Sequence, residues 1–302
     1  MTTDLLVTGG YGLVGSEFSN AIKFHSNQFD LTDQTQTQNL FDQYRPRRVI
    51  HTAAKVGGIR ANIDLPGQFY LDNILMNTHV IEQARLHGVE KMICFLSTCV
   101  FPDGVNICSD ESMIHSGPPH SSNFAYAYAK RMCDIQLQAY NQQYGTTYFS
   151  VIPTNIYGPN DNFSLEHGHV LPALIHRCYL AKQNNIDLTV WGSGKPLREF
   201  IFSKDVADLC LKLLESDHHT TPVILSSMQE ITIADLILLI CDAMKFKGNI
   251  VFDSTKPDGQ YRKNSTNAKL SSIIKDYKFT PIQQGIEITV DHFLNNFNRI
   301  RK

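Results

Sequence analysis

Short apolar runs alternate with longer amphipathic segments along the first half of the chain. Buried strands are predicted for the apolar runs at residues 5–8, 22–25, 48–54, 91–96 and 147–153. Helices are predicted for the segments between them, at residues 13–21, 36–44, 67–87 and 123–144. Strands that alternate with helices at these distances indicate an α/β fold with a doubly wound parallel sheet.

The second half of the chain has shorter elements and more glycine and proline between them. Strands are predicted at residues 188–191, 199–202 and 222–226, and helices at residues 170–182, 203–216 and 232–244. A turn at residues 256–259 precedes a last helical region that reaches residue 302. We expect a dinucleotide-binding domain of residues 1–155, joined by residues 199–226. A smaller substrate-binding lobe, of residues 156–198 and 227–302, would clasp a substrate over the sheet edge.

A glycine-rich turn follows the first predicted strand directly. Its residues are Gly9, Gly10, Tyr11, Gly12, Leu13, Val14 and Gly15. Glycines at this spacing let the chain turn tightly, approach a pyrophosphate and pack a helix on the sheet, and the helix N-terminus attracts the phosphates. This arrangement predicts a Rossmann-type dinucleotide site.

The next stretch departs from the usual Rossmann pattern. The predicted strand at residues 22–25 lacks the terminal acid that would hold a ribose 2′-hydroxyl. Ser26 and Asn27 stand there instead, with Lys23 and His25 nearby. A 2′-phosphate is tolerated by such a set, which favours NADP(H) as cofactor. Asp30, in the following turn, is expected to contact the adenine.

Tyr126 and Lys130 lie four residues apart on a predicted helix, and therefore on one face of it. The ammonium is expected to lower the pKa of the phenol from its usual value of about 10, which would suit general acid–base catalysis. Ser97 follows the strand at residues 91–96, and ligands bind at the carboxyl ends of such strands. Tyr128 is expected to turn away. Ser97, Tyr126 and Lys130 form the residue set of the short-chain dehydrogenase/reductase superfamily.

Other reactive side chains allow two interpretations each. Cys99 is either a small buried hydrophobe or an acid/base beside a carbonyl, and His169 is either a capping or surface histidine or a site residue. Arg177 follows His169 by two helical turns. Arg177 and Arg198 either grip a diphosphate or form surface ion pairs, and Trp191 can stack on a base or sugar.

Composition excludes several classes of function. The 302 residues suffice for one large α/β domain or two modest lobes. A net charge of −2 without a basic block gives no reason to expect a nucleic acid or a membrane surface as partner, and no apolar run approaches the roughly 18 residues of a membrane span. Seven scattered cysteines without metal-ligand spacing indicate reduced thiols, a cytoplasmic protein and no metal site.

Seven blocks of sequence carry a family resemblance in their order and spacing: residues 51–59, 97–102, 126–130, 153–163, 169–174, 191–200 and 256–259. With these blocks the chain resembles, nearly end to end, the GDP-L-fucose synthase family of extended short-chain reductases. The resemblance implies a bifunctional, NADPH-dependent 3,5-epimerase and 4-reductase that acts on GDP-4-keto-6-deoxy-D-mannose. It also implies a homodimer that pairs the helices at residues 67–87 and 123–144 into a four-helix bundle.

The resemblance further implies a role for each matching residue. Tyr126 would donate the proton to the C4 oxygen, with Lys130 as its partner and nicotinamide-ribose ligand and Ser97 as second hydroxyl. Cys99 and His169 would be the acid/base pair that inverts C3 and C5. Further cofactor contacts would come from Pro153, Thr154, Asn155, Ile156 and His169. The nucleotide sugar would be held by Arg177, Trp191, Arg198 and Asp258.

Two departures and two alternatives remain at this stage. Tyr11 replaces a basic residue that some members carry, and about ten residues are missing before Asp30, so both departures concern the adenosine ribose. One alternative is a related epimerase/reductase for another 4-keto-6-deoxy nucleotide sugar, such as a UDP-linked or N-acetylated one. The other is a non-catalytic cofactor-binding sensor. A sensor would be expected to lose members of the Ser97, Tyr126 and Lys130 set, and all three are present.

Overall fold

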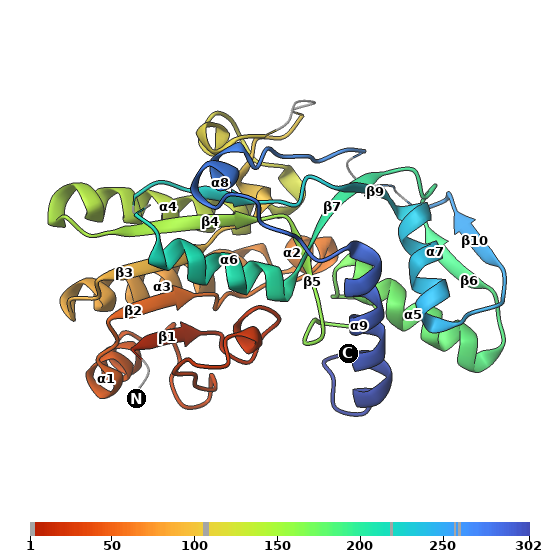
Figure 1. Ribbon diagram of the computed structural model, residues 1–302, viewed down its shortest axis with the longest axis horizontal. Helices are drawn as coiled ribbons and strands as arrows, with labels where there is room; N and C mark the ends of the chain where they lie inside the picture. Colours follow the sequence, from red (N-terminus) through yellow and green to blue (C-terminus); the bar gives the residue numbers. More distant parts are fainter. Residues whose placement is uncertain (1–3, 105–108, 218–219, 257, 259–260) are drawn as a thin grey trace.

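The computed structural model describes residues 4–104, 109–217, 220–256, 258 and 261–302. Its centre is a parallel sheet in the order β1-β2-β3-β4-β8, which confirms the predicted doubly wound α/β class (Figure 1). The sheet consists of β1 (Leu5–Thr8), β2 (Arg48–His51), β3 (Lys91–Phe95), β4 (Tyr148–Pro153) and β8 (Val223–Leu225). Ile22 bridges to Leu6 on the other side of β1, so the chain reverses its winding direction at β1. Ligands bind at such a switch point.

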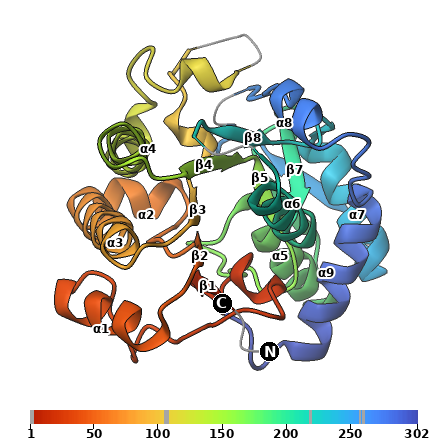
Figure 2. The ribbon, with the colours of Figure 1, turned by 60° about the vertical axis from the view of Figure 1, so that its left-hand side comes forward.

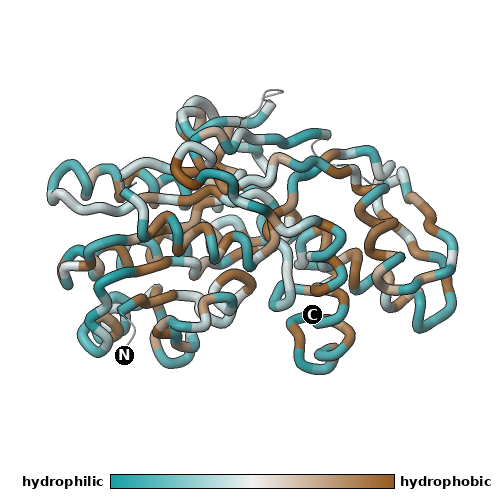
Figure 3. The backbone as a smooth tube through the Cα atoms, in the orientation of Figure 1, coloured by the Kyte–Doolittle hydropathy of each residue, from teal (hydrophilic) through white to brown (hydrophobic). Residues whose placement is uncertain are grey.

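Helices cover both faces of this sheet. One face packs on α1 (Gln34–Tyr44), α3 (Pro66–Leu86) and α4 (Phe124–Tyr144), and the other on α6 (Ser203–Glu215) and α8 (Ala268–Ile273). Neighbouring strand residues alternate between the two cores: Leu6 faces the first and Leu5 and Val7 face the second. Because both faces are covered, the strands are almost fully buried and consist mostly of apolar residues, and brown segments in Figure 3 mark such hydrophobic stretches.

A second lobe lies beside the carboxyl ends of the strands (Figures 1 and 2). It contains α5 (Val170–Asn184), α7 (Ile233–Met244), α9 (Ile282–Asn296), and the parallel pair β6 (Leu188–Trp191) and β10 (Ile250–Asp253). A three-stranded sheet of β5 (Asn155–Tyr157), β7 (Leu197–Phe202) and β9 (Glu230–Thr232) connects the lobes. The lobe has its own apolar core. On this basis we propose a dinucleotide-binding domain of residues 1–155, joined by residues 199–226, and a substrate-binding lobe of residues 156–198 and 227–302.

The predicted helix at residues 13–21 is wrong. This stretch contains only a 3₁₀ turn, η1 (Gly15–Glu17), after which Phe18 is extended. The physical reason is the position of Ile22, whose N–H donates to the Leu5 carbonyl at 2.8 Å and whose carbonyl accepts from Val7 N–H at 2.9 Å. Only six residues separate Gly15 from Ile22, too few for a helix and a return to the sheet. The predicted strand at residues 22–25 is likewise reduced to one bridge.

Other differences are smaller. The short helix α2 (Ile59–Asp64) and the strands β5, β9 and β10 were not expected from the pattern, and the expected last helical region consists of the two helices α8 and α9. The expected turn at residues 256–259 lies partly outside the described residues. None of the helices in the described part of the chain has the length and hydropathy needed to cross a lipid bilayer.

Candidate active site

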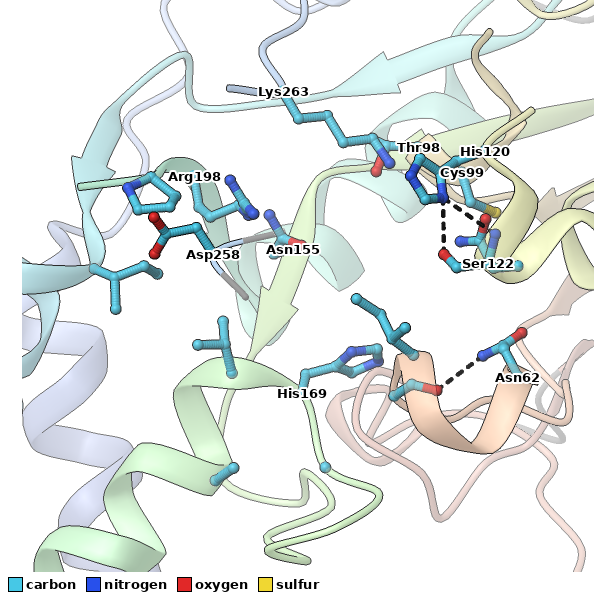
Figure 4. Close-up of a pocket in the computed structure, with 18 of the residues that line it drawn as sticks. Asn62, Thr98, Cys99, His120, Ser122, Asn155, His169, Arg198, Asp258 and Lys263 are labelled. Atoms are coloured by element: carbon cyan, nitrogen blue, oxygen red, sulfur yellow. Dashed lines mark hydrogen bonds between the residues drawn. The ribbon is translucent and has the colours of Figure 1, made fainter. Parts of the chain in front are cut away.

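A cavity of about 580 Å³ lies between the two lobes, at the carboxyl ends of the sheet strands (Figure 4). Its walls come from segments far apart in sequence, including the β3 exit, α2, the start of α5 and the loop after β10. The predicted site residues that line it are Ser97, Cys99, Asn155, His169, Arg177, Trp191, Arg198 and Asp258. The structure thus brings together the sugar-side residues that the sequence analysis selected.

Cys99 reaches the cavity wall because β3 ends in a tight turn. Ser97 caps the 3₁₀ turn η2 (Thr98–Val100), and its Oγ accepts from the Cys99 N–H at 3.4 Å. The Cys99 side chain is 7% exposed but faces the cavity. Burial raises the pKa of its thiol, and Lys263 is the strongest of the nearby groups that lower it. Cys99 therefore combines a packed position with access to a ligand.

Tyr126 and Lys130 share one face of α4, as predicted. Lys130 is almost fully buried, its Nζ lies 5.9 Å from the centre of the Tyr126 ring, and it donates a hydrogen bond to the Phe95 carbonyl at 2.8 Å. The Tyr126 ring packs edge-on against Phe69. Tyr128, on the same helix, is exposed and turned away, as expected.

The expected effect of Lys130 on Tyr126 is wrong for this structure. Burial raises the pKa of the Tyr126 phenol above its usual value, and proximity to Cys99 raises it further. Burial also lowers the pKa of Lys130. Withdrawal from water thus outweighs the attraction between phenolate and ammonium. Tyr126 is a neutral phenol near pH 7, which is the form that can donate a proton.

His169 stands directly before the first residue of α5 and makes no capping hydrogen bond with its side chain. Figure 4 shows its imidazole projecting into the cavity from the side opposite Cys99. Burial lowers its pKa, so the ring is neutral near pH 7. The loop before it contacts the β2–α2 connection, where Gly58 N–H donates to the His167 carbonyl at 3.0 Å.

Two arginines and the tryptophan form the far end of the cavity. The Arg177 guanidinium lies 3.9 Å from the centre of the Trp191 ring, a cation–π contact. Burial lowers the pKa of Arg198, and Asp258 opposes that shift. Asp258 accepts from the Ser193 N–H at 2.6 Å and from its hydroxyl at 2.8 Å. Among the described residues neither arginine forms a salt bridge, so the ion-pair interpretation fails and both can meet an anionic ligand.

Lys263 and His120 are among the polar residues of the cavity wall that the sequence analysis missed. Lys263 belongs to a loop that is held in place by the carboxylate of Glu199, a residue only 2% exposed. The Glu199 oxygens accept hydrogen bonds from Ser265 N–H at 3.2 Å and from Ser265 Oγ at 2.8 Å. His120 Nδ1 accepts from Ser122 N–H at 3.1 Å. Both residues lie in irregular segments, and no spacing in the sequence marks either of them as cavity-lining.

The glycine turn has the geometry of a dinucleotide-binding loop. Gly9 has a φ of +66°, and a Cβ there would lie 2.8 Å from Thr52 Oγ1. A Cβ on Gly15 would lie 2.2 Å from the Gly9 carbonyl oxygen, so only glycine fits at these positions. Thr154, at the end of β4, has a buried hydroxyl without a partner among the described residues, which suits a contact with a bound ligand. The residues present therefore fit a dinucleotide.

The other expected cofactor residues flank this turn. Leu13 and Val14 follow Gly12, whose N–H donates to the Gly9 carbonyl at 2.9 Å, and Asp30 is exposed and accepts from Thr32. Asn155 Nδ2 donates to the Glu199 carbonyl at 2.7 Å, and Ile156 follows it in β5, with Pro153 at the end of β4. No cluster in the described residues could hold a metal ion.

A parallel sheet with a glycine turn at its switch point, Ser97 just after β3, and Tyr126 with Lys130 on the helix α4 that contacts the end of β3, is the arrangement of the short-chain dehydrogenase/reductase class. A family model described as "NAD dependent epimerase/dehydratase family" matches residues 5–224. The chain is 46% identical to a GDP-L-fucose synthase from Dictyostelium discoideum over 99% of this chain and 97% of that protein. It is 41% identical to a probable GDP-L-fucose synthase from Drosophila melanogaster, over 99% of each chain.

Among solved structures, the chain is similar to a GDP-L-fucose synthetase from Naegleria fowleri bound to NADP. The TM-score is 0.93 at 43% identity, over 99% of this chain and 94% of that one. The chain belongs to the NAD dependent epimerase/dehydratase family and, within it, to the GDP-L-fucose synthases.

Proposed function

We propose that this protein is an NADPH-dependent 3,5-epimerase and 4-reductase that converts GDP-4-keto-6-deoxy-D-mannose to GDP-L-fucose. The observation that carries the proposal is that one cavity is lined by both Cys99 and His169, which come from different walls of it. At its far end Arg177, Trp191 and Arg198 are arranged for an anionic nucleotide. The similarity to synthases of this name supports the same reaction.

The epimerase half uses the acidity of the protons beside the ketone. A base on one face removes the proton from C3 or C5, and the electron pair passes into an enolate. An acid on the opposite face then returns a proton to the carbon with inversion. The position of Cys99 and His169 on different walls of the cavity supports such an exchange. Burial raises the pKa of the Cys99 thiol, and the nearby Lys263 opposes that rise, which is the direction that favours the reactive thiolate.

The reductase half follows, because reduction removes the ketone that makes the neighbouring protons acidic. The chemistry that bound NADPH contributes is a hydride for C4. Tyr126, kept neutral by burial, donates its proton to the C4 oxygen, and Ser97 donates a hydrogen bond to the same oxygen. Lys130 would hold the nicotinamide ribose beside Tyr126. The glycine turn would hold the pyrophosphate, Asp30 would contact the adenine, and residues 153–156 with His169 would contact the nicotinamide side.

A product assay tests the function. Purified protein would be incubated with NADPH and a panel of GDP-linked, UDP-linked and N-acetylated 4-keto-6-deoxy sugars, and the products identified by NMR. We expect GDP-L-fucose as the main product. If only a UDP-linked or N-acetylated sugar were turned over, the proposed substrate would be wrong. If the sugar were reduced without inversion at C3 and C5, the proposed epimerase activity would be wrong.

We further propose a cytoplasmic homodimer. The six cysteines that the structure describes are all free thiols, as a reducing compartment favours. On α4 the apolar residues Tyr128, Met132 and Ile135 are exposed at helical spacing, and α3, which packs on α4, exposes Leu71 and Leu86. A twofold four-helix bundle would bury these faces. Light scattering should give twice the chain mass of 34.1 kDa, and a monomer at micromolar concentration would contradict the dimer.

A further inference from the structure

Beside the glycine turn, Tyr11 and His25 form a parallel aromatic stack. Their ring centres lie 3.9 Å apart and the planes differ by 2°. Tyr11 is 54% exposed, so the stack lies at the protein surface beside the glycine turn. The stack fixes the imidazole of His25 next to the turn that would hold the pyrophosphate.

Lys23 also contacts the glycine turn. Its aliphatic stem packs against Gly10, where a Cβ would lie 2.7 Å from Lys23 Cγ. Its Nζ donates to the Ser16 carbonyl at 3.1 Å, within the 3₁₀ turn. An ammonium carries three donors, so further hydrogens can meet a ligand. The carboxylate of Glu17 is nearby and is itself hydrogen-bonded by Ser203 Oγ at 2.6 Å.

The position of these groups in the fold indicates what they would meet. Ile22 lies beside β1 as the remnant of the second strand, so Lys23 and His25 follow directly where that strand ends. In dinucleotide-binding sheets the residue at this end contacts the 2′-oxygen of the adenosine ribose. Residues 23–29 contain no acid, and a lysine and a histidine occupy this place.

We propose that Lys23 and His25, supported by the Tyr11 ring, form the binding site for the 2′-phosphate of NADPH. The site rests on the cofactor of the proposed function and adds the residues that select NADPH over NADH. A phosphomonoester carries a charge of about −1.5 to −2 at pH 7 and three acceptor oxygens. Lys23 supplies the positive charge, and the His25 ring supplies a donor held in place by stacking.

Direct binding measurements test the site. Dissociation constants for NADPH, NADH, 2′,5′-ADP and 5′-AMP would be measured by calorimetry for the wild type and for Lys23→Met, Lys23→Gln and His25→Phe. Methionine keeps the stem that packs on Gly10, glutamine also keeps a donor for the Ser16 carbonyl, and phenylalanine keeps the stack with Tyr11. Lys247→Met, at an exposed position of the second lobe, is the matched control.

We expect both Lys23 variants to raise the dissociation constants of NADPH and 2′,5′-ADP by about tenfold or more, and His25→Phe to raise them by about threefold. The dissociation constants of NADH and 5′-AMP should change by less than about twofold. If the variants bound ligands with and without the 2′-phosphate equally more weakly, Lys23 would only stabilise the turn and the proposed site would be wrong. Unchanged affinity for all four ligands would also overturn the site. A wild type that prefers NADH overturns the site and leaves the reductase standing. A wild type that binds neither cofactor overturns the proposed function as well.

Discussion

The two ends of the site are built in different ways. The sugar end is assembled from segments separated by more than a hundred residues, and its supports are buried, such as Cys99 and Glu199. The adenosine end is local: it consists of one glycine turn, one 3₁₀ turn and one bridge, with Tyr11 exposed.

The difference shows which part of the molecule tolerates change. Residues on an exposed turn can be lost or replaced when nearby side chains offer the same contact, because few other groups depend on them. At the sugar end one carboxylate, Glu199, holds Ser226, Ser265 and the backbone of Ser265 together. Loss of such a group disturbs several parts of the cavity, so we expect substitutions there to have larger effects.

Tyr126→Phe should have the largest effect. It removes the proton donor with little change of volume, and general acid catalysis typically contributes about 10²–10⁴-fold to the rate. We expect kcat for NADPH oxidation to fall by that range while the dissociation constant of the sugar nucleotide stays close to wild type. Tyr144→Phe, at the exposed C-terminal end of the same helix, is the control. Wild-type turnover by Tyr126→Phe would remove Tyr126 from the mechanism.

Cys99→Ser should abolish proton exchange at the sugar. In deuterium oxide, wild-type protein should introduce label at C3 and C5 of the 4-keto sugar without NADPH, because exchange needs only the enolate. A serine hydroxyl has a far higher pKa than a thiol, so we expect wash-in to fall by about 10²-fold or more, measured by NMR. His169→Gln should hinder reprotonation on the opposite face. Exchange at the wild-type rate in Cys99→Ser would make Cys99 a packing residue.

Glu199→Gln should affect the sugar end alone. It weakens the hydrogen bonds that hold Ser265, and with it the loop that carries Lys263. Hydrogen bonds to a charged group contribute about 1.5–3 kcal/mol, so we expect KM for the sugar to rise roughly tenfold. The dissociation constant of NADPH should change less than twofold. Glu230→Gln is the control, because Glu230 forms an ion pair with Arg262 of the same loop, and the Arg262 side chain is half exposed. Equal losses in sugar and cofactor binding would mean that Glu199 supports the whole fold.

Asp161→Asn should have the smallest effect, visible in the pH dependence of stability. Burial raises the pKa of Asp161 to about 7, and its Oδ2 has no hydrogen-bond partner among the described residues. The folded pKa exceeds the unfolded value, so the native state binds more protons and wild-type stability falls as pH rises from about 4 to about 7. The Asn variant should therefore melt about 2–4 °C higher than wild type at pH 8, with a clearly smaller gain at pH 5. A gain of equal size at both pH values would point to packing instead of charge.

The sequence predicted the elements whose pattern is repeated over many residues. The apolar runs of β1, β3 and β4 and the long helices α3 and α4 lie where expected, and the motif residues of the sugar end line one cavity. The prediction of a helix at residues 13–21 was wrong because the hydrogen bonds that pair Ile22 with β1 outweigh the local preference for helix. The pKa of Tyr126 shifts opposite to expectation because spacing on a helix carries no information on burial. Lys263 was missed for a similar reason, since tertiary packing alone brings it to Cys99.

The last residues of the chain are part of the second lobe, and this matters for protein engineering. The Arg301 carbonyl accepts from Phe163 N–H at 2.9 Å, and the Arg301 side chain donates to the Asn160 carbonyl at 2.8 Å. The Lys302 ammonium lies 3.5 Å from the centre of the Phe297 ring. These contacts hold the loop that leads to His169. An affinity handle joined directly after Lys302 would compete with them, so a surface loop of the sheet domain is the better place to attach a label or a solid support.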